Sequence, residues 1–313
     1  MKLSIVTTLY CSAPYVEEFH RRVSAVARQL VGEDYEIVMV NDGSPDNAVD
    51  VAIALTKSDP HMVVVDLSRN FGHHKAIMAG VGQTFGEKVF VIDVDLEEEP
   101  ELLHAFWRTM EKQAVDLVYG VQKSRKGGWF ERWSGGLFYG LFNVLSHTTI
   151  PKNTIIAKLM TRRFADALLK HQERTIFLGG LIALTGFSQV PVLCVKKSKP
   201  TTTYTFRRKL AQCVDSITSF SAKPLYFFFW FGGATMLISF FILTFLVARR
   251  ILMGTTVEGW TSLFVITSLF FGLTMMALGT IGIYLSKIFE EVKARPYVVI
   301  RQVLRYPSCD GKN

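Results

Sequence analysis

The sequence predicts an α/β domain with a mostly parallel sheet, followed by an amphipathic helix at a membrane surface and a two-helix transmembrane hairpin. Two observations carry this prediction. Strand and helix patterns alternate through the first part of the 313-residue chain, and two long uncharged runs follow near its end. We expect four parts: 1–200 as a cytoplasmic α/β domain, 201–223 as the surface helix, 224–286 as two membrane helices and 287–313 as a cytoplasmic tail.

The α/β domain is predicted from short apolar runs that alternate with segments of helical periodicity. Such alternation is typical of a parallel sheet with helices on both faces. We expect strands at 3–9, 36–41, 63–67, 88–93 and 116–121, and helices at 15–30, 46–57 with Asp46 as its cap, 73–82, and 100 to about 113. Ligands of such sheets bind at the carboxyl ends of the strands, so polar residues there are the first site candidates.

Asp42 follows the second predicted strand in the run Asn41-Asp42-Gly43-Ser44. Its carboxylate can accept hydrogen bonds from a nucleobase N–H or a ribose hydroxyl, and Gly43 permits a tight turn. The same residues are also common in turns that bind nothing.

Asp93 and Asp95 end the fourth predicted strand. Residues two apart in an extended segment point to the same side, so the two carboxylates would repel each other without a cation between them. Oxygen ligands of this kind suit Mg²⁺ or Mn²⁺ shared with a diphosphate. Glu97, Glu98 and Glu99 extend the acidic patch. The alternative is a solvated acidic loop before a helix N-terminus.

The third predicted strand leads into the segment 67–75, which contains Arg69 and Lys75. Both cations can contact phosphate oxygens. The adjacent His73 and His74 lack metal-ligand spacing, and we expect them to have a structural or hydrogen-bonding role.

The uncharged runs 225–247 and 262–285 are each long enough to cross about 30 Å of hydrocarbon as a helix. Their short link predicts antiparallel neighbours. Lys/Arg residues before the first run and after the second place both ends in the cytoplasm, although Arg249 and Arg250 in the link oppose this orientation. Ser268 and Gly272 form a small-residue face, from which we expect a homo-oligomer.

The segment 205–221 has apolar residues at helical spacing and basic residues elsewhere, which predicts a helix lying on the inner leaflet or packed on the α/β domain. The net charge of +8 favours a membrane surface or a phosphorylated substrate over nucleic acid. The four scattered cysteines indicate a reducing compartment and form no zinc pattern.

These motifs, in this order at strand ends and followed by the hairpin, resemble family 2 glycosyltransferases with the GT-A nucleotide-sugar-binding fold. The resemblance covers nearly the whole chain and extends to polyprenyl-phosphate glycosyltransferases, the group that includes dolichyl-phosphate mannose synthases and bacterial serotype-conversion glucosyltransferases. It implies a metal-dependent, inverting transfer at the inner membrane from a nucleotide-sugar, preferably a UDP-sugar, to polyprenyl (undecaprenyl) phosphate. The acceptor oxygen would attack the anomeric carbon directly.

The resemblance also implies roles for individual residues. Asp93 and Asp95 would be catalytic and hold Mg²⁺ or Mn²⁺. The donor nucleotide would be bound by Thr8, Tyr10, Asp42, Arg69, Lys75 and Asp93, and the acceptor phosphate by Arg125, Arg132, Lys158 and Arg207.

The chain departs from this group near the acceptor. In the segment 153–160, Ile156 stands where the group carries an acid, and Lys158 replaces an arginine. Either the acceptor needs no base, or another acid such as Glu97 or Glu98 substitutes, or activity is lost. The alternatives to the polyprenyl-phosphate transferase are therefore a transferase that acts on a hydroxyl of a lipid-linked glycan and a non-catalytic membrane scaffold that binds a nucleotide-sugar. A transporter fits less well, because the spans carry no charge.

Overall fold

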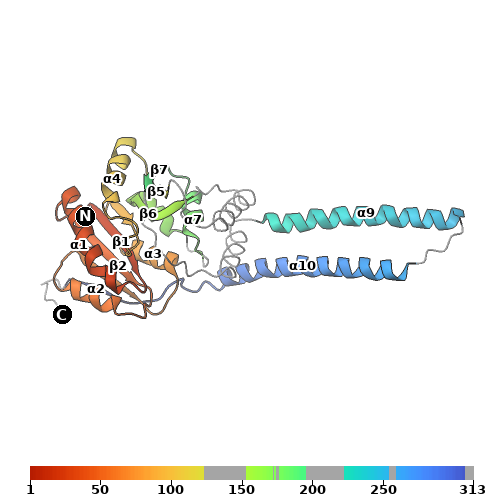
Figure 1. Cartoon of the computed structure of the whole chain (residues 1–313), viewed down its shortest axis with the longest axis horizontal. Coiled ribbons are helices and arrows are strands. Elements are labelled where there is room, and N and C mark those ends of the chain that lie inside the picture. The colour runs from red at the N-terminus through yellow and green to blue at the C-terminus, as the bar shows by residue number, and fades with distance from the viewer. Residues whose placement is uncertain (123–152, 172, 174–175, 195–221, 254–258, 307–313) are drawn as a thin grey trace. The chain divides into compact units, whose positions relative to one another are not determined.

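The computed structural model describes residues 1–122, 153–171, 173, 176–194, 222–253 and 259–306. These residues fall into two compact units (Figure 1). One unit holds all the described strands and the shorter helices, and the other holds the two long helices α9 and α10. The first unit includes the strand after α10, so the chain leaves it and later returns.

The first unit is built on an eight-stranded sheet with the order β7-β5-β6-β4-β1-β2-β3-β8. Strands β1 to β4 run parallel, β6 is antiparallel to β4 and β5, β7 is parallel to β5, and β8 is antiparallel to β3. The strands are β1 (Leu3–Leu9), β2 (Tyr35–Asn41), β3 (Met62–Leu67), β4 (Lys88–Val91), β5 (Leu117–Gln122), β6 (Thr154–Thr161), β7 (Gln189–Cys194) and β8 (Ile300–Arg305).

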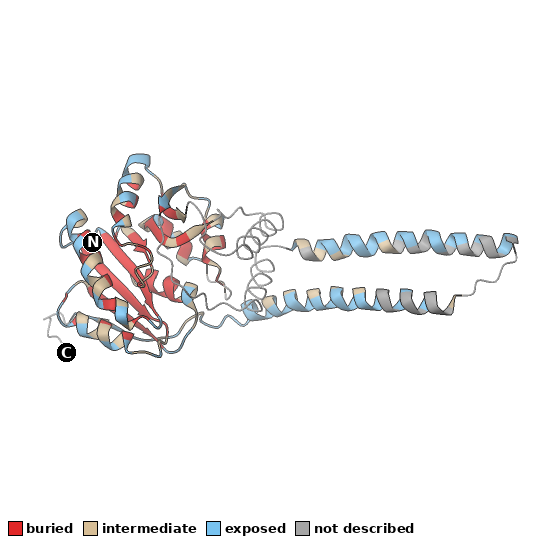
Figure 2. Cartoon of the chain, viewed as in Figure 1, coloured by how far each residue is buried: buried red, intermediate tan, exposed pale blue. Residues whose placement is uncertain are grey.

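Helices cover both faces of this sheet, and strands β1 to β4 are almost entirely buried between them (Figure 2), whereas the edge strand β8 is mostly exposed. Apolar side chains of α1 (Ala13–Val31), α2 (Ala48–Thr56) and α4 (Leu102–Gln113) pack with the sheet in one core cluster. The helices α3 (His73–Val81), α6 (Arg162–Leu169) and α7 (Leu178–Leu184) complete the unit. Helix α3 packs closely on β1 and β2, since a Cβ at Gly80 would lie 2.5 Å from a methyl group of Val6. This close packing fixes the start of α3 beside the carboxyl ends of those strands.

The predicted elements up to 122 are confirmed, with their ends shifted by up to two residues. Two shifts affect the site. Strand β4 ends at Val91, so Asp93 and Asp95 lie in a loop and not in the strand. Helix α2 starts after Asn47, and Asp46 instead accepts hydrogen bonds from the backbone N–H groups of Ala13 (2.9 Å) and Ala48 (3.3 Å), which ties α1 to α2.

Residues 287–306 of the predicted tail are divided between two elements of the fold. Residues up to Val292 belong to α10, and β8 extends the sheet of the first unit by pairing with β3. Edge strand β8 is held there by main-chain hydrogen bonds and by arginine side chains that reach buried acids of β2 and β3. These partners are too distant in sequence for a local pattern to reveal them.

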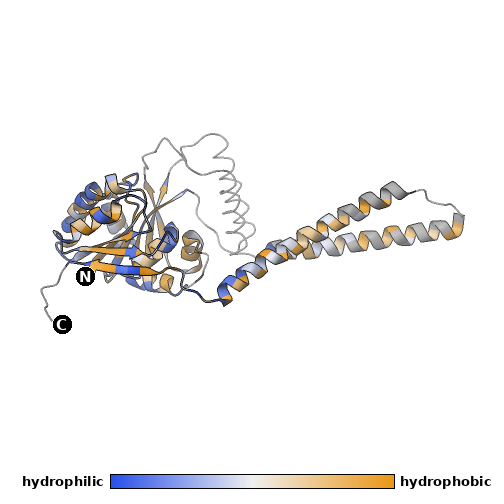
Figure 3. Cartoon of the chain, turned by 90° about the horizontal axis from the view of Figure 1, so that it is seen from below, coloured by the Kyte–Doolittle hydropathy of each residue, from blue (hydrophilic) through white to orange (hydrophobic). Residues whose placement is uncertain are grey.

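Both predicted membrane runs are helical, within α9 (Lys223–Met253) and α10 (Trp260–Val292), and the two helices contact each other. Most of their described side chains are exposed (Figure 2), and many are apolar (Figure 3). Trp230 on α9 and Phe271 on α10 are 71% and 66% exposed. Within the described part of the chain, one segment, Phe270–Val292, is long and apolar enough to cross a membrane. The predicted surface helix lies outside the described residues, apart from its last two.

Candidate functional site

The strand order places a topological switch point between β1 and β4. The chain proceeds from β1 outward to β2 and β3, and then returns to add β4 on the other side of β1. In open α/β sheets, ligands bind outside the carboxyl ends of the strands at such a point. Thr8 and Tyr10 lie at the end of β1, Asp42 follows β2, and Asp93 follows β4. The fold thus brings these sequence-predicted residues to one edge of the sheet.

A pocket of about 250 Å³ opens at this edge. We call it the β1–β2 pocket, and its lining residues are Thr8, Tyr10, Asp42, Asn70, Gly72 and His73. Three of the six were predicted as donor-binding residues. The other three come from the loop between β3 and α3 and from the first residue of α3. Its lining combines apolar surface with a few polar groups, such as those of Thr8, Asn70 and His73, which can hydrogen-bond a nucleotide.

Asp42 holds the β3–α3 loop against the end of β2. Its two carboxylate oxygens accept the backbone N–H groups of Phe71 (2.7 Å) and Gly72 (3.0 Å), and the residue is buried. Burial raises the pKa of Asp42, and the two backbone hydrogen bonds and the neighbouring His73 act in the opposite direction. Asp42 therefore shapes the wall of the β1–β2 pocket, a role that the sequence did not indicate.

Gly43 makes the close approach of this loop possible. Its φ is +61°, and a Cβ there would lie 2.5 Å from the backbone nitrogen of Asn70. Any side chain at this position would push away the segment that supplies Asn70 to the pocket. The glycine is therefore required by both its backbone conformation and its contact.

His73 connects the β1–β2 pocket to the acidic loop after β4. Its Nδ1 lies 3.0 Å from Oγ1 of Thr8, and its Nε2 lies 3.4 Å from Oδ1 of Asp93. The first residue of α3 thus spans from the end of β1 to the end of β4. The sequence pattern indicated only a structural or hydrogen-bonding role for this histidine, and the structure shows which residues it contacts.

The acidic loop can supply carboxylates for a divalent metal. Asp93 keeps 21% of its side chain exposed, and Oδ1 of Asp95 accepts the backbone N–H of Glu97 at 3.1 Å. Among the described residues, no group of three or more His, Cys, Asp or Glu side chains forms a preassembled metal cage. In proteins, Mg²⁺ usually binds one or two carboxylates and completes its coordination with substrate phosphates and water. Asp93 and Asp95 supply two carboxylates of the type that such an ion binds.

Glu98 attaches the acidic loop to β6, and Lys158 hydrogen-bonds within β6 beside it. Glu98 is fully buried, and its oxygens accept the backbone N–H groups of Ile156 (3.1 Å) and Ala157 (2.7 Å). Nζ of Lys158 donates to the carbonyl oxygens of Ile155 (2.6 Å) and Ile156 (3.2 Å). Burial lowers the pKa of Lys158 to about 8, and the charges of Glu98 and Asp93 oppose this shift.

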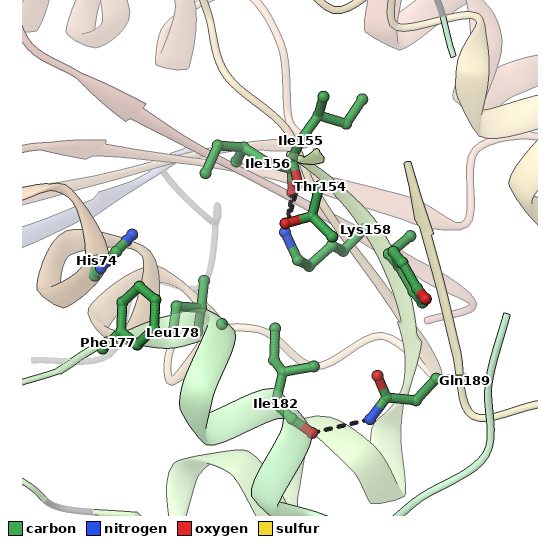
Figure 4. Close-up of a pocket in the computed structure, with 11 residues that line it drawn as sticks. His74, Thr154, Ile155, Ile156, Lys158, Phe177, Leu178, Ile182 and Gln189 are labelled. Carbon is green, nitrogen blue, oxygen red and sulfur yellow. Dashed lines mark hydrogen bonds between the residues drawn. The ribbon is translucent and has the colours of Figure 1, made fainter. Parts of the chain in front are cut away.

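A second pocket, of about 180 Å³, lies beside the start of β6 (Figure 4). We call it the β6 pocket. Ile156, Phe177 and Ile182 supply apolar lining, and Lys158 also lines the pocket with its nitrogen already hydrogen-bonded. His74 also contributes to the lining, and burial lowers the pKa of this histidine to about 4, aided by the charges of His73 and Lys158. Its neutral ring suits the apolar surroundings.

The remaining predicted contacts divide into two groups. Arg69 and Lys75 do not line the β1–β2 pocket. Arg69 is stacked on the ring of Phe71 at 4.4 Å, and Lys75 is in the first turn of α3. Arg125, Arg132 and Arg207, predicted for the acceptor phosphate, lie outside the described residues.

Comparison with known proteins gives the family. Residues 4–172 match the model of glycosyl transferase family 2. A Mycobacterium tuberculosis protein named as a glycosyltransferase is 45% identical over 97% of this chain and 88% of its own. The undecaprenyl-phosphate 4-deoxy-4-formamido-L-arabinose transferase of Enterobacter is 29% identical over 97% of this chain and 94% of its own.

A solved structure shows the same fold. The mannosyltransferase PcManGT from Pyrobaculum calidifontis, in complex with GDP-Man and Mn²⁺, matches with a TM-score of 0.50 and 16% identity. The match covers 70% of this chain and 63% of that one, so it spans less than two thirds of the solved chain. From the matched family model and the identity to its relatives, the chain belongs to glycosyl transferase family 2, with the GT-A fold.

Proposed function

We propose that the protein is a membrane-anchored, metal-dependent glycosyltransferase that moves a sugar from a nucleotide-sugar to polyprenyl phosphate with inversion at the anomeric carbon. One observation carries the proposal. The β1–β2 pocket and the Asp93–Asp95 loop lie at the same edge of the sheet, with His73 between them. A nucleoside bound in the pocket can direct its diphosphate toward the two carboxylates.

Asp93 and Asp95 would hold Mg²⁺ or Mn²⁺ through one oxygen or more each. When bound, the ion neutralises the charge of the departing nucleoside diphosphate. His73 would keep Asp93 oriented, and Asp42 would hold Asn70 and Gly72 where they contact the donor. The name of PcManGT, with GDP-Man and Mn²⁺ bound, supports a donor of this class. We take a UDP-sugar as the first to be tested.

The surroundings of β6 favour a phosphate acceptor over a hydroxyl. A hydroxyl needs a general base, whereas a phosphate monoester is already ionised near neutral pH. Ile156 provides no base, and Glu98, one of the two acids considered as substitutes, is fully buried with both oxygens on backbone N–H groups. The transferase of Enterobacter named above acts on undecaprenyl phosphate, which supports the same acceptor here.

The path of the chain supports a hairpin that crosses the membrane twice. Strand β3 comes before the two long apolar helices, β8 comes after them, and the two strands pair in one sheet. A single crossing would place β3 and β8 on opposite sides of the membrane, so the number of crossings must be even. The exposed apolar surface of α9 and α10 needs a nonpolar environment. Two crossings satisfy both conditions and keep the α/β domain on the basic, cytoplasmic side.

The test is a transfer assay with the full chain in detergent micelles or lipid nanodiscs. Undecaprenyl phosphate and Mn²⁺ are incubated with a panel of labelled nucleotide-sugars, and the label is followed into the organic phase. We expect one donor to give a lipid product, whose anomeric configuration, measured by NMR, is opposite to that of the donor. Transfer only to a lipid-linked glycan would identify a hydroxyl acceptor. Donor binding without transfer to either acceptor would indicate a scaffold and overturn the proposal.

A further inference from the structure

Strand β8 carries two arginines, and each reaches a buried acid of the sheet. Asp66 lies near the carboxyl end of β3, and Glu36 lies near the amino end of β2. Nη1 of Arg301 lies 3.1 Å from Oδ2 of Asp66, and its Nη2 donates to the carbonyl oxygen of Ser68 at 3.1 Å. Arg305 pairs at 3.8 Å with Glu36, near the amino ends of the parallel strands. The two arginines are four residues apart on one strand and have different surroundings. They therefore form a matched pair for comparison.

The carboxylate of Asp66 accepts hydrogen bonds from both Arg301 and Asn41. Its Oδ1 accepts a hydrogen bond from Nδ2 of Asn41 at 2.8 Å, and Oδ1 of Asn41 accepts the backbone N–H of Ser44 at 3.0 Å. The Asp66 side chain is only 4% exposed. A buried carboxylate is costly without a cationic partner, and Arg301 supplies that partner from the surface. A continuous chain of hydrogen bonds thus runs from Arg301 to the turn after β2.

The same arginine holds the start of the β3–α3 loop. Ser68 begins this loop, its carbonyl accepts from Arg301, and its N–H donates to the carbonyl oxygen of Val299 at 2.9 Å. The loop continues to Asn70 and Gly72, which line the β1–β2 pocket. Both segments that shape this side of the pocket, 41–44 and 68–72, are therefore joined to β8.

We propose that Arg301 is a positioning residue for the donor, which fixes the segments 41–44 and 68–72 around the β1–β2 pocket. This inference rests on the proposed function, in which the nucleotide-sugar binds in that pocket. Because β8 follows α10, the wall of the pocket depends on chain that lies beyond the membrane hairpin. Arg301 touches no donor atom in this account and acts through Asp66 and Ser68.

The experiment compares Arg301→Gln with Arg305→Gln in the full chain, with Arg301→Lys as the conservative variant. We expect Arg301→Gln to raise the KM for the nucleotide-sugar by about tenfold or more, the effect of losing a charge-assisted hydrogen bond, with little change in kcat. Backbone hydrogen exchange should become faster in 41–44 and 68–72. Arg301→Lys should recover part of the affinity, because an ammonium group can pair with Asp66 but lacks the fork that also reaches Ser68.

Arg305→Gln is the control for a general loss of sheet stability. It should leave the donor KM and the exchange of these two segments near wild type, even where it lowers the melting temperature. Equal donor KM values for the two glutamine variants, or unchanged exchange in Arg301→Gln, would overturn the inference. Absence of wild-type turnover would reject the proposed function instead, and the exchange comparison would still decide the role of Arg301.

Discussion

Glu98 and Lys158 bind opposite sides of the same peptide segment at the start of β6. The carboxylate accepts the N–H groups of Ile156 and Ala157, and the ammonium group donates to the carbonyls of Ile155 and Ile156. Two buried, opposite charges therefore stabilise a segment where the β5–β6 register is irregular. Glu98 also keeps the loop with Asp93 and Asp95 next to β6.

We predict that Glu98→Gln destabilises the protein without removing a catalytic group. A glutamine has one acceptor oxygen, so one of the two N–H groups loses its partner, and Lys158 loses a compensating charge. We expect a loss of about 2 kcal/mol, seen as a melting temperature lower by roughly 5 °C. Glu87→Gln, at an exposed position, is the control. Loss of a general base lowers kcat by about a hundredfold or more. If Glu98→Gln lowered kcat by that much at an unchanged melting temperature, Glu98 would instead be a general base.

A comparison of two glycines tests the loop contact at Gly43. Gly32 and Gly43 both have positive φ values, of 65° and 61°, but only a Cβ at Gly43 would meet other atoms. Gly32→Ala should therefore show the conformational cost alone, about 1–3 kcal/mol, because φ 65° with ψ −135° is a conformation that residues other than glycine rarely adopt. Gly43→Ala should cost more and should also raise the donor KM, because Asn70 is displaced. Equal stability and equal donor KM for the two variants would show that this contact does not shape the pocket.

The lowered pKa of His74 predicts that the free energy of unfolding falls in acid. Its pKa is about 4 in the folded protein, below its ordinary value of 6.5. Between these values the unfolded chain takes up a proton that the folded protein does not, so the free energy of unfolding falls as pH falls from 6.5 to 4 and levels off below. Denaturant unfolding should show wild type losing roughly 2 kcal/mol more than His74→Gln over this range.

The control for this measurement is His104→Gln, which removes a histidine from α4, on the other side of the sheet from α3. Its unfolding curves show what the loss of a histidine from another helix does to stability. If His74→Gln and wild type lose the same stability over the range from pH 6.5 to 4, the lowered pKa of His74 is wrong.

The first five strands and four helices could be predicted from sequence because their signals are local. Strand β1, for example, is an apolar run whose seven residues are all buried. Strand β6 was missed for a physical reason. It carries Lys158 near its centre, and a lysine argues against a buried strand unless its partner is known. That partner, Glu98, is sixty residues earlier in the chain.

The same limit applies to the site. The pattern at Asn41–Ser44 identified Asp42 as important, but the backbone groups that it binds lie 29 and 30 residues later. Sequence alone therefore could not distinguish a carboxylate that faces a ligand from one that holds a loop. The run of three glutamates before Pro100 was the available signal for Glu98, and only the fold shows which of them is buried.

The most direct test of the account is Mn²⁺ binding in the presence of a nucleoside diphosphate, followed by the electron paramagnetic resonance signal of free Mn²⁺. The full chain should take up one Mn²⁺ together with the nucleotide, and Asp95→Asn should lose this uptake and the sugar transfer while its melting temperature stays near wild type. Asp95→Asn that binds Mn²⁺ and transfers sugar like the wild type would contradict the central claim that Asp93 and Asp95 hold the metal beside the β1–β2 pocket.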